Sequence, residues 1–212
     1  MVGFGEGGAR DLLIDSLPLA FINAAGSLVA VFYIDKLGRR FILLRTIPFI
    51  GATLLLIAAG LGVYSYANSE GMRSNIICYI IFLAAGTYTS LGGIMLYLVF
   101  FSVGMGGTPW TINSEIYPLH LRGCGLSIST TTNWVTNYFV SQLFLTLMKT
   151  PLSRVLTFSS ISIFALLAWI FVYLLIPETK GRTIEDIVSE LCPESVKNPL
   201  EIEHIMKIEE EE

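Results

Sequence analysis

Five long apolar stretches constrain this 212-residue chain more than any other feature of its sequence. A bilayer core about 30 Å thick needs roughly 20 apolar helical residues to cross it. Lipid offers no partner for backbone polar groups, so a crossing segment forms a helix that satisfies its own hydrogen bonds. Three of the stretches contain no charged residue, and the other two contain one each, near an end. We therefore expect an all-α membrane protein with five spanning helices, at about residues 12–34, 41–66, 92–112, 123–148 and 155–176.

Composition agrees with a lipid environment. Charged residues make up 14% of the chain, against about 25% in soluble domains. A net charge of −4 without a basic cluster argues against binding to nucleic acid. Three scattered cysteines and two histidines without ligand spacing predict no disulfide scaffold and no metal site. The spans carry no nucleophile–base pair, carboxylate pair or phosphate loop, so we expect neither an enzyme nor a cofactor.

The apolar segment 76–87 has two interpretations. It is either a sixth span or an extension at the membrane surface, and it is short for a crossing. The polar tetrapeptide Thr87–Ser90 is expected to end it. With five spans, one side of the membrane collects most basic residues, which marks the cytoplasmic side. We therefore expect residues 1–11 to be an external polar start and 177–212 a cytoplasmic acidic tail, with a short helix at 183–191 capped by Thr183.

Polar residues recur at helical spacing in three of the predicted spans. Such residues often join membrane helices by hydrogen bonds, and that interpretation is favoured for single serines and threonines. Asparagine and tryptophan side chains also suit a cavity for a neutral polyhydroxylated ligand, because amides donate and accept while an indole offers an apolar face. The candidates for this cavity are Asn23, Trp110, Asn133, Asn137 and the neighbouring Trp134.

A cluster of glycines with Pro109 predicts an interruption in the third span. Gly104, Gly106 and Gly107 loosen the backbone there, and the proline removes a helix hydrogen bond. An interrupted helix near the membrane middle is typical of transporter binding sites. A packing kink without function would have the same sequence.

Charged residues gather in the segments that connect the spans on the predicted cytoplasmic side. Complementary pairs there could hold helices together in one conformation and release them in another. An exposed pair contributes about 0–1 kcal/mol, so several would have to act together. Anchoring by flanking charge is the alternative. The candidate residues for this charge network are Asp35, Arg39, Arg40, Glu115, Arg122, Glu178 and Arg182.

Three of these segments resemble signature motifs of the sugar porter family, within the major facilitator superfamily. The loop DKLGRR at 35–40 is similar to the family's charged loop. Residues 107–118, which run GTPW to SEIYP, resemble its tenth-helix signature and the following loop, and PETKGRT at 177–183 resembles its motif after the twelfth helix. The order and spacing agree over nearly the whole chain. Residues 113–118 and 133–137 look most similar to the proton/myo-inositol cotransporters.

The resemblance implies a fold of twelve helices in two halves, with a sugar site between them at the membrane midplane. The five spans would correspond to helices eight to twelve, that is, to the carboxy-terminal half without its seventh helix and the Gln-Gln pair on it. Met1 would then be an internal methionine of a longer ancestral chain, the start of a truncated gene model or the start of a genuine fragment.

The resemblance also implies roles for individual residues. Asn23 matches an eighth-helix asparagine that contacts sugar, and Trp110 matches a tenth-helix tryptophan that packs over it. Asn137, with Trp134 near it, matches eleventh-helix contacts. The charge network would close the cytoplasmic side in the outward-facing state. Ser102 departs from facilitative glucose carriers, which have glutamate there, and the acid that couples proton symporters lies outside these five helices.

The leading hypothesis is transport of a sugar or polyol, myo-inositol or a hexose, by alternating access. Its partners would be that solute, membrane lipid, protons as a candidate co-substrate, and the missing amino-terminal half or a full-length carrier. The chain would lie in the plasma membrane or in a vacuolar or other organellar membrane. Five helices cannot enclose a site that needs both halves, so the chain alone is expected to transport poorly or not at all. The alternative is a non-transporting fragment or pseudo-transporter that associates with a full-length carrier.

Overall fold

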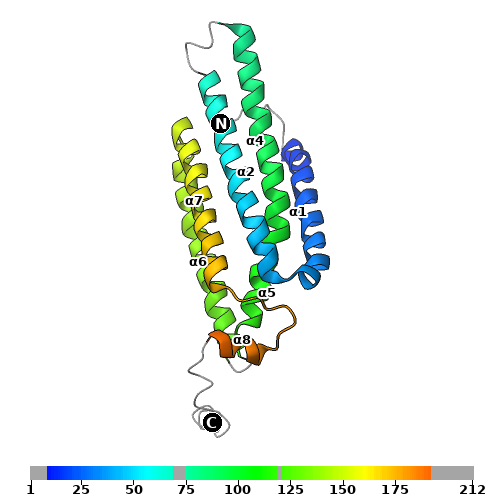
Figure 1. Ribbon diagram of the computed structural model, residues 1–212. Coiled ribbons are helices and arrows are strands. Elements are labelled where there is room, and N and C mark those ends of the chain that lie inside the picture. Colours follow the sequence, from blue (N-terminus) through cyan, green and yellow to red (C-terminus); the bar gives the residue numbers. More distant parts are fainter. Residues whose placement is uncertain (1–8, 69–74, 119–120, 192–212) are drawn as a thin grey trace.

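The computed structural model describes residues 9–68, 75–118 and 121–191. All regular secondary structure within these ranges is helical, as the sequence predicted. Five long helices run side by side, and two short ones lie near one end of the bundle (Figure 1). The long helices are α1 (Ala9–Leu37), α2 (Arg39–Ala67), α4 (Ile76–Gly104), α6 (Arg122–Leu147) and α7 (Pro151–Leu175). The short ones are α5 (Thr108–Glu115) and α8 (Ile184–Leu191).

Four segments of the described chain are long and apolar enough to cross a membrane, namely Ser16–Leu37, Arg39–Ala67, Ile76–Glu115 and Pro151–Leu175. The predicted all-α membrane fold is thus confirmed. α6 has 26 residues, which is long enough for a crossing, but its hydroxyl and amide side chains lower its apolar content below that of the others. The crossing of α6 stays a prediction.

The third predicted span begins earlier than expected. The sequence placed it at 92–112, after a separate segment at 76–87. α4 instead runs without a break from Ile76 to Gly104, through the tetrapeptide Thr87–Ser90 where an end was predicted. That prediction is wrong, and the segment is neither a sixth span nor a separate surface extension.

Hydrogen bonds within the helix explain why polar residues do not end α4. The hydroxyl of Thr87 donates to the carbonyl of Leu83, and that of Ser90 to the carbonyl of Gly86, both at 2.9 Å. Each side chain therefore satisfies its donor without leaving the helix. A Cβ atom on Gly86 would come within 2.5 Å of the Tyr64 backbone nitrogen, so α4 lies directly against α2 here.

The predicted interruption after α4 is confirmed. α4 ends at Gly104, and α5 starts at Thr108 with Pro109 in its first turn. Proline cannot donate to a preceding carbonyl, so it begins a helix more readily than it continues one. Gly104 has no room for a side chain, because a Cβ atom would overlap the side chain of Thr46 on α2.

α2 is the central helix of the bundle and packs against α4 on one side and α7 on the other, while α1 packs mainly on α4. A small apolar core joins α2, α5 and α7 and consists of Leu43, Ile47, Ile112 and Val172. α6 has no buried residue in the described structure. Of the five long helices, α6 therefore packs least against the rest of the bundle.

The short helix predicted at 183–191 is present as α8. The hydroxyl of Thr183 accepts a hydrogen bond from the backbone N–H of Asp186 at 3.2 Å, and the Asp186 carboxylate accepts one from the Thr183 N–H at 3.4 Å. This reciprocal pair is the predicted cap. Residues 192–212 of the predicted tail, and 1–8 of the predicted external start, lie outside the described residues.

Candidate functional site

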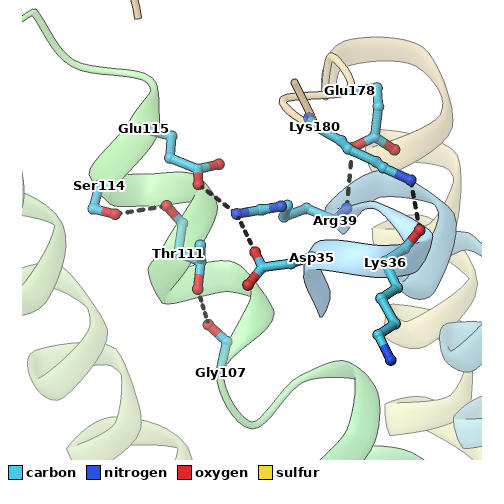
Figure 2. A network of polar contacts seen from close by, with 9 residues as sticks. All are labelled: Asp35, Lys36, Arg39, Gly107, Thr111, Ser114, Glu115, Glu178 and Lys180. Atoms are coloured by element: carbon cyan, nitrogen blue, oxygen red, sulfur yellow. Dashed lines mark hydrogen bonds and ion pairs between the residues drawn. The ribbon is translucent and has the colours of Figure 1, made fainter. Parts of the chain in front are cut away.

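Arg39 lies at the centre of a charge cluster at one end of the bundle (Figure 2). Its Nη2 atom is 2.8 Å from Asp35 Oδ1 on α1 and 3.0 Å from Glu115 Oε1 on α5. Its backbone N–H donates to Glu178 Oε1, in the segment after α7, at 3.0 Å. The Arg39 side chain is 14% exposed, whereas that of Asp35 is 75% exposed. One arginine at the start of α2 thus connects three other parts of the chain.

Glu178 caps the start of α2. Its carboxylate accepts hydrogen bonds from the backbone N–H groups of Arg39 and, at 3.3 Å, Phe41. The first N–H groups of a helix have no partner within the helix and favour a negative charge. Gly38, between α1 and α2, has a φ of 97°, and a Cβ there would come within 2.7 Å of Glu178 Oε2. Only glycine fits this turn while the carboxylate stays in place.

The remaining predicted network residues lie near this cluster but outside it. Arg40 donates to the carbonyl of Tyr173, at the end of α7, at 2.6 Å. Arg182 pairs with Glu190 of α8. Arg122 has no ion pair in the described residues, and its Nε is buried without a partner. The structure therefore joins four of the seven predicted residues directly: Asp35, Arg39, Glu115 and Glu178.

Lys180 was not among the predicted site residues. Its Nζ donates to the carbonyl of Lys36, at the end of α1, at 2.5 Å (Figure 2). The segment after α7 therefore holds the turn between α1 and α2 through both a lysine and a glutamate. The sequence shows a lysine in the charged segment 177–183, which is compatible with a contact at this end of the bundle. It does not identify the partner of Lys180, because that partner is a backbone carbonyl and belongs to no motif.

A cavity of about 540 Å³ lies among five helices, α1, α2, α4, α6 and α7. Asn23 lines it from α1, Tyr97 from α4 and Phe144 from α6. Asn23 Oδ1 lies 2.6 Å from the hydroxyl of Ser102, which is almost fully buried between α1 and α4. The same hydroxyl lies 2.6 Å from the carbonyl of Leu98, and its one proton can be donated to only one of these two oxygens. The Asn23 amide nitrogen makes no hydrogen bond in the described residues.

The predicted α6 residues are not joined to Asn23 by any hydrogen bond in the described structure. Asn133 and Asn137 are exposed and lie eleven and seven residues before Phe144. These spacings place both amides on the same helix face as Phe144, which lines the cavity. Trp134 is 65% exposed beside them, and Trp110, on α5, is 42% exposed. Asn23 therefore lines the cavity, whereas Asn133 and Asn137 lie about 16 and 10 Å from Phe144 along the axis of α6 and are not among the lining residues.

The fold and these sites define an integral, multi-pass membrane protein with the architecture of the major facilitator superfamily. The solved proton:xylose symporter XylE from E. coli superposes with a TM-score of 0.70 at 22% identity, over 88% of this chain and 36% of XylE. At that identity the likeness shows the fold alone.

The chain belongs to the sugar (and other) transporter family, whose family model matches residues 3–191. Membrane transporter D1 of Leishmania donovani is 37% identical over 185 residues, 86% of this chain and 31% of that protein. The human proton myo-inositol cotransporter is 45% identical over 103 residues, 49% of this chain and 16% of that protein. These matches confirm the resemblance seen in the motifs. The chain spans about a third or less of the length of these relatives.

Proposed function

We propose that this chain forms part of a carrier that moves a sugar or polyol, myo-inositol or a hexose, across a membrane by alternating access. The observation that supports the proposal is the cavity among five helices, which Asn23 lines from α1 and Phe144 lines from α6. The names of relatives support the class of solute, because they include inositol and polyol transporters. A proton as co-substrate belongs to the same proposal and rests on the name of the human relative alone.

The chemistry of these residues suits a neutral solute with many hydroxyl groups. Asn133 and Asn137 each offer a donor and an acceptor, and Asn23 retains its amide donor beside Ser102. Trp110 and Trp134 would cover the C–H face of a sugar ring. Further helices of the carrier, supplied by an amino-terminal half or by a full-length partner, would close the cavity around the solute.

The charge cluster would act as a latch at the cytoplasmic end. Arg39, Asp35 and Glu115 connect α1, α2 and α5, so their separation would let these helices move apart. Arg39 Nε and Glu115 Oε2 are buried and make no hydrogen bond in the described residues, so each could form one in another arrangement of the cluster. A cluster with unused bonding capacity can rearrange at a lower cost than a saturated one. Arg40, Arg122 and Arg182 would support the latch from the same end.

The experiment joins this chain to the amino-terminal part of the human proton myo-inositol cotransporter and measures uptake of labelled myo-inositol and hexoses. Asn137→Ala should raise KM about fivefold, the effect of one lost hydrogen bond, and Trp110→Ala should also raise it. Gln142→Ala is the matched control, because this amide points to the opposite side of α6 from Asn133. Unchanged kinetics in both site variants would reject the site.

A second function is favoured by α6, which has no buried residue in the described structure and so offers a face for another helix. The chain would then be a non-transporting partner of a full-length carrier, with the polar residues of α6 forming interhelical hydrogen bonds. The uptake experiment separates the two functions. A chimera that carries no sugar or polyol would support the non-transporting partner, and saturable uptake by the isolated chain would contradict it.

A further inference from the structure

A second hollow, which we call the α2–α7 groove, lies between α2 and α7. Its volume is about 510 Å³, and all its lining residues belong to these two helices. Pro48 and Gly51 line it from α2, and Ser162 and Trp169 from α7. Because the other helices contribute nothing, the groove opens away from the cavity of the candidate site. α2 and α7 are both candidate membrane spans by length and composition, so a groove on their outer side would face lipid.

Three polar side chains line this groove, and two of them, Ser162 and Trp169, are paired within the protein, while Ser159 makes no side-chain hydrogen bond in the described residues. Trp169 donates its indole N–H to the carbonyl of Leu44 at 3.0 Å, and Ser162 donates its hydroxyl to the carbonyl of Gly51 at 2.9 Å. The Leu44 carbonyl is free to accept because Pro48, four residues later, has no N–H. Apart from the Ser159 hydroxyl, the surface left to an occupant is apolar, which suits a hydrocarbon chain.

Arg45 lies on the α2 face that borders the groove. It precedes Pro48 by three residues, Ala52 by seven and Leu55 by ten, all of which line the groove. It is exposed, its guanidinium lies 5.4 Å from the centre of the Phe41 ring, and it has no carboxylate partner in the described residues. An unpaired arginine within a span is costly unless its charge reaches the interface or meets an anion.

The position of Arg45 lets it meet a lipid headgroup. It lies six residues into α2, roughly 9 Å along the helix from its start, and a long side chain can extend that distance towards the interface. The same end of the molecule carries Arg39, Arg40 and Lys180. Basic residues collect on the cytoplasmic side, whose leaflet holds the anionic lipids.

We propose that the α2–α7 groove and Arg45 bind an anionic glycerophospholipid of the bilayer. One acyl chain would lie in the groove along Pro48 and Trp169, and the phosphate would contact the guanidinium of Arg45, which Phe41 holds in place. Arginine matches the geometry of a phosphate with paired N–H donors. The phosphate of zwitterionic phosphatidylcholine could also reach Arg45, but its choline cancels the net charge, so Arg45 favours a headgroup that is anionic overall. Inorganic phosphate would meet the arginine but would leave the groove empty.

The test uses tryptophan fluorescence of the full chain in phosphatidylcholine bilayers. Trp110→Phe and Trp134→Phe leave Trp169, in the groove, as the remaining one of three tryptophans. Brominated phosphatidylglycerol should quench it at about fivefold lower mole fraction than brominated phosphatidylcholine with the same acyl chains, the effect of one basic residue near an anionic headgroup. Arg45→Gln should remove this preference, Arg45→Lys should retain part of it, and added inorganic phosphate should not displace the lipid.

Two controls make the experiment decisive. Lys149→Gln removes an exposed charge at the other end of the bundle and should leave the preference intact. Ala52→Phe fills the groove and should reduce quenching by both lipids. Equal quenching by the two lipids, a preference that survives Arg45→Gln, or an equal loss in Lys149→Gln would each overturn the proposal. Arg45 is exposed and takes no part in the core, and an unchanged Trp169 emission maximum in plain phosphatidylcholine would verify that each variant is folded.

Discussion

Trp169 donates a hydrogen bond to a backbone carbonyl of α2 that Pro48 leaves without its helical partner. Pro48 lies inside α2 and cannot donate to the carbonyl of Leu44. Trp169 of α7 donates to that carbonyl instead. In lipid there is no water to take this place, so the interhelical bond contributes to holding α7 against α2. The proline was visible in the sequence, but its partner, 121 residues later, could be found only from the fold.

We expect Trp169→Phe to lower the free energy of unfolding by about 0.6–1.7 kcal/mol, the range for interhelical hydrogen bonds in membrane proteins. The loss should be smaller in a Pro48→Ala background, because alanine restores an N–H to the Leu44 carbonyl. Denaturation in detergent followed by circular dichroism measures both values. The same loss in both backgrounds would show that the indole contributes through packing alone.

At the scale of helices, the sequence predicted the turn at 35–40, where Gly38 separates α1 from α2. It placed the start of the last span at 155, whereas α7 begins at Pro151, after Thr150, which accepts a hydrogen bond from the Ser153 N–H. The prediction was wrong at Thr87–Ser90, because apolar patterning does not show that a hydroxyl can bond back to its own helix. The interruption before Pro109 was found because glycine and proline change the backbone directly.

The proposed latch connects α1, α2 and α5, and we expect Arg39→Gln to loosen these helices. The variant loses the ion pairs to Asp35 and Glu115, each worth about 0–1 kcal/mol. A cysteine introduced at Ile116, which packs partly buried beside α5, should then react with a thiol reagent faster, by at most about 30-fold for two such pairs. The background has the three native cysteines replaced by serine.

Lys149→Gln is the control for the latch, because Lys149 is exposed and lies after α6, at the end of the bundle away from Arg39. It should leave the labelling rate of the introduced cysteine unchanged. Equal rates in the parent and in Arg39→Gln would contradict the latch, because the cluster would then have no influence on the separation of these helices.

At the scale of the whole molecule, the sequence identified the residue types of the candidate site but not their arrangement. The polar spacing on α1 and α6 predicted amide-bearing faces. Of the predicted amides, Asn23 lines the cavity, to which α6 contributes Phe144. The sequence could not show that Asn23 is engaged by Ser102, or that Arg122 lacks an ion pair in the described residues. Both depend on how closely particular helices approach, which packing of small residues such as Gly26 determines.

The orientation of the whole molecule in the membrane follows from the basic residues at the Arg39 end and can be tested with native cysteines. Cys78 lies in the first turn of α4 and Cys124 in the first turn of α6, at opposite ends of the bundle. If the Arg39 end faces the cytoplasm, a membrane-impermeant maleimide applied to intact cells should label Cys78. Cys124, which is exposed, should react only after permeabilisation. Single-cysteine variants that also carry Cys192→Ser separate the two signals, and the reverse pattern would invert the topology and place the proposed latch outside.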